Sequence, residues 1–367
     1  MFARTNKSFL SRWWWTIDRW SFAALACLVI LGAFMAMATS PLMAERLKLD
    51  TFYFARRHLM LLGPSVAIMI AISLCSLQQV RLLAAFILAV GLVMLVATPI
   101  IGVEIKGARR WLNFGGLSIQ ISEFIKPAFA VVTAWLFTQR VQKPHLLTHY
   151  MAIVLWMVVV GLLLLQPDLG MAVVITAIWV VEFFLMGVPI TWVVICAILC
   201  VGGITTAYYL FPHVSSRIDR FLDPSHGDCY QISRSLDAFM NGGWTGKGPG
   251  EGVVKRVLPD AHADFVFAVI GEEFGVLLCL LIVGMFAVLV FQSLRRVFQD
   301  HDLFTIMAVT GLAVQIGLQA IVNMASALHL IPTKGMTLPF LSYGGSSLLA
   351  LSVAMGMLLA LTRRRLV

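Results

Sequence analysis

Residues 331–347 read IPTKGMTLPFLSYGGSS, and they set two prolines, a lysine and a pair of glycines directly against a long apolar segment. Spanning a membrane does not require such a sequence. Backbone that is broken at membrane depth is tolerated only where protein buries it or where a water-filled cavity adjoins it. The stretch therefore predicts a polar site beside the end of a membrane-spanning helix.

The composition predicts an integral membrane protein. Of the 367 residues, 60% are hydrophobic and 12% are charged, and the mean hydropathy is +0.91. These values are far from those of a soluble domain. We expect an all-α protein with about ten transmembrane helices, because windows of about 20 apolar residues can each cross the hydrocarbon layer. The windows lie near 21–40, 59–77, 82–101, 122–138, 148–165, 171–187, 190–211, 264–293, 303–328 and 340–362.

Basic residues predict that both termini are cytoplasmic. The first window is too long for the apolar core of a signal peptide, about 7–15 residues, so we expect an uncleaved helix and an even number of spans. Loops rich in lysine and arginine stay in the cytoplasm. Such residues, with few acids, occupy the short loops on the side of the termini: Arg81, Arg140, Lys143, Arg295, Arg296 and Arg363 to Arg365.

The net charge of +9 does not indicate nucleic-acid binding, because the basic residues are scattered over loops and form no compact module. Contacts with anionic lipid headgroups and the orientation of the chain in the membrane explain most of the positive charge. Five of the six cysteines fall in apolar windows, so we expect no disulfide framework. No set of His, Cys and carboxylate residues has a recognised metal spacing, and no cofactor is evident. The sequence leaves a divalent-cation requirement open.

Glu123 and Lys126 stand at the start of the fourth window, and their spacing places them on one face of a helix. In a structural interpretation, Ser122 caps this helix and Lys126 extends its ammonium group to the membrane surface. In a functional one, Lys126 serves a site, because ionisable groups inside a span are usually functional. The sequence alone leaves both open.

Two further carboxylates lie near the sixth window. Asp168, within Gln166-Pro167-Asp168-Leu169-Gly170, fits a tight turn, but it also lies on the outer side with the other polar groups and is a site candidate. Glu182 stands alone inside the window, and we expect it to make a hydrogen bond between helices.

The segment 212–262 is the one long loop outside the membrane, and we place it on the outer side. It has too few apolar residues to form a core of its own, so the chain is predicted to be a single membrane domain over 1–367. It carries Arg217, Gln231 and the glycine-rich run 246–250. Glycines let a backbone approach a ligand closely, but a flexible surface loop explains them equally well.

Asp264 stands where this loop re-enters the membrane, directly before an apolar run. Loss of water raises the pKa of such a carboxyl and a neighbouring cation lowers it, which together suit a general base. The alternative is an N-cap of the helix that follows. Glu272 and Glu273, deeper in the same window, need internal partners and are interpreted as structural.

Several motifs, in the same order along the chain, resemble the SEDS family of cell-wall proteins (shape, elongation, division and sporulation). They are residues 108–111, 120–126, 166–170, 217–224, 230–231, 246–250, 262–275 and 331–347. The sequence Thr333-Lys334-Gly335 is similar to that of division-type members. The resemblance covers nearly the whole chain.

The resemblance implies a ten-helix glycosyltransferase that polymerises lipid II, a lipid-linked disaccharide-peptide, into peptidoglycan outside the cytoplasmic membrane. It places the catalytic aspartate on Asp264. It implies a class B penicillin-binding transpeptidase and other septal division proteins as partners, and a location at the division septum.

We expect an inverting transfer. One carboxylate can act as the base, and the cations around it can bind the departing diphosphate. The candidate substrate-binding residues are Arg110, Glu123, Lys126, Asp168, Arg217, Gln231, Lys334 and Ser342. We further expect Lys126 to pair with Asp264. The alternatives are a flippase for the same precursor, whose polar groups would lie near the membrane midplane, and an inactive scaffold.

Overall fold

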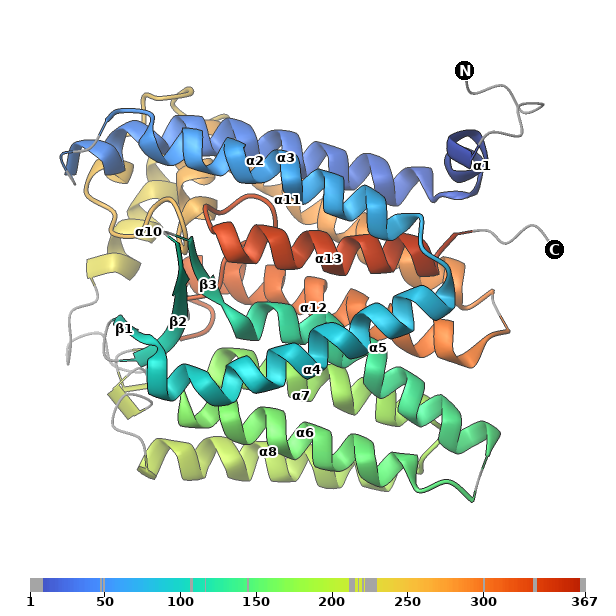
Figure 1. Cartoon of the computed structure of the whole chain (residues 1–367). Coiled ribbons are helices and arrows are strands. Elements are labelled where there is room, and N and C mark those ends of the chain that lie inside the picture. The colour runs from blue at the N-terminus through green and yellow to red at the C-terminus, as the bar shows by residue number, and fades with distance from the viewer. Residues whose placement is uncertain are drawn as a thin grey trace.

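The structure, a computed structural model, describes residues 9–46, 48, 50–105, 108–115, 117–143, 145–210, 215–216, 218–219, 221, 230–299, 301–332 and 335–363. Long helices run side by side through the molecule (Figure 1). A helix overlaps each of the ten predicted apolar windows. These helices are α2 (Arg19–Arg46), α3 (Tyr53–Ser73), α4 (Leu77–Ile101), α5 (Ile121–Gln142), α6 (Thr148–Leu165), α7 (Leu169–Leu185), α8 (Ile190–Leu210), α11 (Val266–Val297), α12 (Leu303–Ala327) and α13 (Gly345–Leu361).

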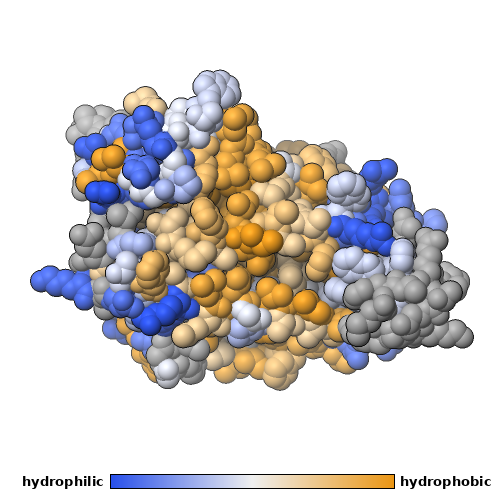
Figure 2. Space-filling model, turned by 90° about the horizontal axis from the view of Figure 1, so that it is seen from above, coloured by the Kyte–Doolittle hydropathy of each residue, from blue (hydrophilic) through white to orange (hydrophobic). Residues whose placement is uncertain are grey.

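The prediction of a helical integral membrane protein is confirmed. Among the described residues, seven helices are long and apolar enough to cross a membrane, while α7 and α13 are apolar but have 17 residues each. On the face seen in Figure 2, apolar side chains cover the middle and hydrophilic ones gather toward both ends. A surface of this kind fits a hydrocarbon layer around the middle of the bundle. The number of crossings stays a prediction.

Helices α5 and α12 lie in the interior of the bundle, together with α13, whose residues are nearly all buried. In α5, 83% of the apolar window is buried, and in α12 it is 72%, whereas in α6 it is 17%. α6 therefore presents most of its surface outward, while α5 and α12 are surrounded by other helices. Polar groups on these two helices must find partners inside the protein, because hydrocarbon offers none.

The all-α prediction is wrong in one place, because a small antiparallel sheet fills the connection between α4 and α5. Its strands are β1 (Val103–Ile105), β2 (Ala108–Phe114) and β3 (Leu117–Gln120), in the order β1-β2-β3. Side chains of β2 alternate between two faces, so Leu112 is buried while Arg109 and Asn113 are exposed. The exposed Arg109 pairs with Glu104 of β1.

The sheet also changes the start of α5. β3 runs directly into the helix, and Gln120 is the N-cap residue, without a side-chain capping bond. Ser122 lies inside α5 with its Oγ buried, and that atom has no hydrogen-bond partner in the described part of the chain. The expectation that Ser122 caps the helix is wrong for this reason.

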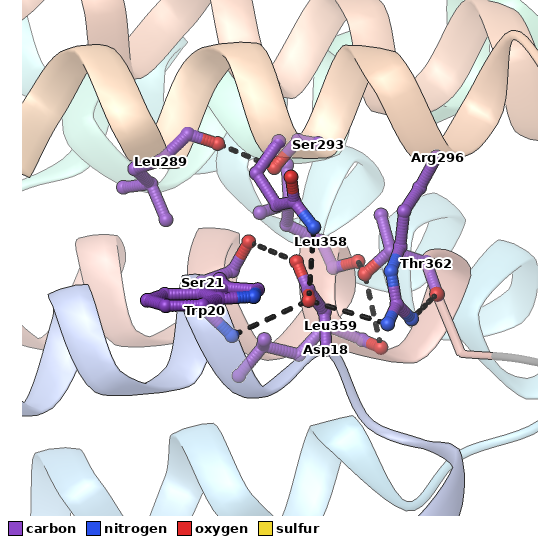
Figure 3. Close-up of polar contacts among 10 residues, drawn as sticks. Asp18, Trp20, Ser21, Leu289, Ser293, Arg296, Leu358, Leu359 and Thr362 are labelled. Atoms are coloured by element: carbon purple, nitrogen blue, oxygen red, sulfur yellow. Dashed lines mark hydrogen bonds and ion pairs between the residues drawn. The ribbon is translucent and has the colours of Figure 1, made fainter.

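The two described ends of the chain meet at the end of the bundle opposite the sheet. Arg363 Nε donates to Thr16 Oγ1 at 3.2 Å. Nearby, buried Asp18 forms an ion pair of 3.2 Å with Arg296, which also donates to the carbonyl of Thr362 at 3.2 Å (Figure 3). These contacts join the start of α2 to the ends of α11 and α13.

The long loop folds back onto α11. It contains helix α10 (Tyr230–Gly242) and the short 3₁₀ helix η2 (Val254–Arg256). Glu272 Oε1 accepts hydrogen bonds from the backbone amides of Val253 and Val254, each at 2.7 Å, and Glu273 forms an ion pair with Lys255. The prediction that the two glutamates have internal partners is confirmed, and they anchor the loop.

A break in α11 receives the glycine-rich part of this loop. Gly275 has φ +75°, which favours glycine, and a Cβ there would collide with the carbonyl of Trp244. The amide of Val276 donates to the carbonyl of Gly243 at 3.0 Å, and the amide of Lys247 donates to that of Glu272 at 3.0 Å. These glycines thus serve close packing of backbone against backbone.

Candidate functional site

Asp264 lies in the turn that precedes α11. The N-cap of the helix is Phe265, so the N-cap interpretation of Asp264 is wrong. A Cβ built on Gly335 would lie 3.3 Å from Asp264 Oδ2, so this carboxyl group faces the broken segment before α13. The structure therefore brings Asp264 and the polar stretch of residues 331–347 together.

Hydrogen bonds hold this broken segment against the Asp264 turn. Ser342 Oγ donates to the carbonyl of Ala263 at 2.5 Å and accepts from the amide of Leu338 at 2.9 Å. The amide of Tyr343 donates to the carbonyl of His262 at 2.9 Å. Ser342, predicted as a substrate-binding residue, thus shapes the segment in this structure.

Lys126 is completely buried, and the structure gives it partners other than the expected one. Its Nζ lies 2.8 Å from Glu123 Oε2 and donates to Gln319 Oε1 at 2.7 Å. The expected pair with Asp264 is wrong. Glu123 stands three residues away on the same helix face, so it compensates the ammonium charge without bringing two helices together.

Two carboxamides of α12 complete this part of the site, and the sequence analysis did not select them. Gln319 Nε2 donates to the carbonyl of Thr337 at 3.1 Å, in addition to the bond from Lys126. Asn323 Nδ2 donates to the carbonyls of Asp264 at 3.0 Å and Met336 at 2.6 Å. A usable signal was present, because polar residues recur every four positions in this apolar helix.

Arg110 and Asp168 form a second part of the site. Arg110 Nη1 lies 3.9 Å from Asp168 Oδ1, and Arg110 Nε donates to the carbonyl of Gln166 at 2.9 Å. Asp168 also accepts from Gln120 Nε2 at 3.2 Å and from the amide of Met171 at 3.5 Å, as the N-cap of α7. Asp168 therefore serves both the turn and the charged group, as the two interpretations proposed.

The electrostatics of Asp168 connect the two parts. Burial raises the pKa of Asp168, which lies between α6 and α7, while the nearby Arg110 guanidinium opposes this rise. Glu123 and Lys126 act on the same carboxyl group, the first raising its pKa and the second lowering it. The charges of Arg110, Glu123 and Lys126 therefore all act on the carboxyl group of Asp168.

Of the remaining candidates, two lie outside the described residues and one lies within them. Arg217 and Lys334 lie outside the described residues. Gln231 is the second residue of α10 and is partly buried. Among the described residues, no group of three His, Cys, Asp or Glu side chains could hold a metal ion.

Glu182 is fully buried, and it meets its expected role. Thr133 Oγ1 of α5 donates to Glu182 Oε2 of α7 at 2.5 Å. A Cβ on Gly311 would collide with the other carboxyl oxygen of Glu182, so α12 also packs closely against Glu182. The prediction of a hydrogen bond between helices is confirmed.

Fold and site together define a helical multi-pass membrane protein with a charged site formed by α5, α12, the sheet and the turn before α11. The model of the FtsW/RodA/SpoVE family, described as cell cycle proteins, matches residues 18–366. The chain therefore belongs to this family, which confirms the predicted SEDS membership.

Relatives and solved structures agree with this assignment. The chain is 42% identical to a probable peptidoglycan glycosyltransferase FtsW of Caulobacter vibrioides, over 99% of this chain and 94% of the relative. It is 34% identical to a protein of the same description from Coxiella burnetii, over 94% of this chain and 96% of the relative.

Among solved structures, the chain is similar to a component of a peptidoglycan synthase complex that coordinates polymerization and crosslinking. The TM-score is 0.79 and the identity 26%, over 94% of this chain and 97% of that component. The rod shape determining protein RodA of Thermus thermophilus gives a TM-score of 0.69 at 25% identity, over 95% of this chain and 97% of RodA.

Proposed function

We propose that this chain polymerises lipid II into glycan strands at the outer face of the cytoplasmic membrane during cell division, with Asp264 as the general base. Its class is peptidoglycan glycosyltransferase, since it belongs to the family and shares 42% identity over its full length with a relative of that description. The observation that supports the site is the position of Asp264 in a turn that faces the broken segment at Gly335.

The reaction needs one proton acceptor and a positive environment for the leaving group. Asp264 takes the proton of the acceptor's GlcNAc 4-hydroxyl, whose oxygen attacks the anomeric carbon of the donor sugar. The bond from that carbon to the diphosphate oxygen breaks, and undecaprenyl diphosphate leaves with the bonding electrons. A positioned base contributes roughly 10²–10⁴-fold in rate.

Arg110 is the described cation best suited to the diphosphate. Its side chain is 23% exposed and lies 3.9 Å from Asp168, while the Lys126 side chain is completely buried and lies 2.8 Å from Glu123. A guanidinium group can bind a phosphate through two parallel hydrogen bonds. Arg217 and Lys334 stay proposed for the same role, and Gln231 for binding the sugar or peptide.

The flippase alternative receives less support. A transport path needs polar groups near the membrane midplane that a substrate can use. Glu182 is engaged by Thr133, and Glu272 and Glu273 bind the long loop. These three carboxylates therefore have structural partners.

We also propose ten membrane crossings, cytoplasmic termini and an outer location for the long loop. The helices over the ten apolar windows and the meeting of Thr16 with Arg363 at one end of the bundle support this topology. The proposed partners are the nascent glycan strand, membrane lipid, a class B penicillin-binding transpeptidase and other septal proteins. The likeness to a peptidoglycan synthase component supports the transpeptidase.

Purified protein in detergent, alone and with its transpeptidase, should convert labelled lipid II into a ladder of glycan products. A detergent solution has no second compartment, so a flippase or a scaffold would leave lipid II unchanged. Lipid II that remains intact in both preparations would refute the polymerase assignment.

A further inference from the structure

We infer that Gln319 and Asn323 are positioning residues for the transfer reaction, and that α12 uses them to hold the Asp264 turn and the Lys126 ammonium group one helical turn apart. The inference rests on the proposed role of Asp264. Neither carboxamide is assigned a role as base or diphosphate ligand.

The geometry of α12 supplies the spacing. Gln319 and Asn323 are four residues apart on one face of a helix, which separates them by about 6 Å along its axis. Gln319 contacts Lys126 Nζ at 2.7 Å, and Asn323 contacts the carbonyl of Asp264 at 3.0 Å. The two side chains thus contact the Lys126 ammonium group and the Asp264 backbone at points one helical turn apart on α12.

The two bonds of Gln319 use both the acceptor and the donor of its carboxamide. Its Oε1 accepts from the Lys126 ammonium group while its Nε2 donates to the carbonyl of Thr337. A carboxylate would keep the first bond and lose the second, because it has no donor when ionised. Gln319 thereby joins α5 to the broken segment before α13.

Asn323 joins the same broken segment to the catalytic turn. One Nδ2 group donates to the carbonyls of Asp264 and Met336, and the residue is buried. Without this donor, the carbonyls of Asp264 and Met336 would each lose a hydrogen bond, close to the point where Asp264 faces Gly335. A displacement of about 1 Å in such a place can reduce a rate by roughly 10²-fold.

The same helix supplies a matched control. Gln315 lies one turn before Gln319, is equally buried, and its Oε1 has no hydrogen-bond partner in the described part of the chain. Replacing Gln315 removes a buried carboxamide from α12 without touching either contact. If the loss of a buried carboxamide from α12 by itself lowers activity, Gln315→Leu will show the same decrease.

The test compares Asn323→Ala, Gln319→Leu, Gln319→Glu and Gln315→Leu in the full-length protein with lipid II. We expect Asn323→Ala and Gln319→Leu to lower kcat roughly 10–100-fold with KM changed less than about threefold, because they displace the base without removing a substrate contact. Gln319→Glu should retain more activity than Gln319→Leu. Gln315→Leu should stay within about twofold of the wild type.

Hydrogen exchange provides a readout that does not need activity. Amides of residues 335–343 should exchange faster in Asn323→Ala and Gln319→Leu than in Gln315→Leu. Equal kcat in Asn323→Ala and Gln315→Leu, or equal exchange in all variants, would overturn the inference. An inactive wild type would instead refute the proposed function, and the exchange comparison would still decide whether the two carboxamides hold the segment.

Discussion

Lys126 and Glu123 form an ion pair of 2.8 Å across one turn of α5, and the side chains are 0% and 4% exposed. The charge of Lys126 is therefore compensated before any substrate arrives. The more exposed Arg110 is the cation that we propose for an incoming diphosphate. The Lys126 ammonium group also connects α5 to α12 through its hydrogen bond to Gln319.

Removing one partner of this pair should destabilise the protein strongly. Glu123→Gln leaves a buried ammonium group without its counter-charge, at an expected cost of about 3–5 kcal/mol in the free energy of unfolding. The double variant Glu123→Gln, Lys126→Met should recover part of this loss. Thermal or denaturant unfolding in detergent measures both, and strictly additive effects would contradict a coupled pair.

Arg110 should act on substrate affinity. Arg110→Lys should keep part of the activity, because an ammonium group still attracts diphosphate, while Arg110→Ala should lose more and raise the KM for lipid II. The exposed Arg109, the preceding residue in β2, offers the matched control Arg109→Ala. Unchanged kinetics in Arg110→Ala would refute the diphosphate role.

Asp168 should make stability depend on pH. Burial raises the pKa of its carboxyl above the ordinary value of 3.8, so protonation is more favourable in the native state than in the unfolded state. Its contribution is fully present below that ordinary value and is lost as pH rises through the raised pKa. Relative to the wild type, Asp168→Asn should thus become more stable as pH increases over this window. Unfolding experiments that show the opposite trend would contradict the assignment.

Gly275 should tolerate no side chain. Gly275→Ala places a methyl group against the carbonyl of Trp244 at positive φ, and we expect a cost of at least about 1–3 kcal/mol and faster proteolysis of the long loop. Gly284 lies in the same helix, and a Cβ added there would meet no atom within 4 Å, so Gly284→Ala is the control. Equal stability of the two variants would contradict the packing role of the break.

The sequence predicted helices over every apolar window because long apolar runs have few other solutions in a membrane. It did not predict the sheet, since β1, β2 and β3 form through pairing between short segments, with Trp111 opposite Gln120. Motif and position selected Asp264, Arg110 and Asp168 as site candidates, and the structure pairs the last two. The predicted partner of Lys126 was Asp264, and the structure has Glu123 instead, a contact that the spacing of three residues on one helix face allows.

The most direct test of the account is polymerisation by Asp264→Asn, compared with Asp260→Asn from the same turn. Asparagine keeps the shape and hydrogen bonding of Asp264 but removes the base, so Asp264→Asn should insert normally, bind lipid II with near wild-type affinity and make no glycan. Asp260 has φ +50°, a conformation that asparagine tolerates well, so Asp260→Asn should remain active. Glycan ladders from purified Asp264→Asn protein at a rate close to that of Asp260→Asn would contradict the central claim.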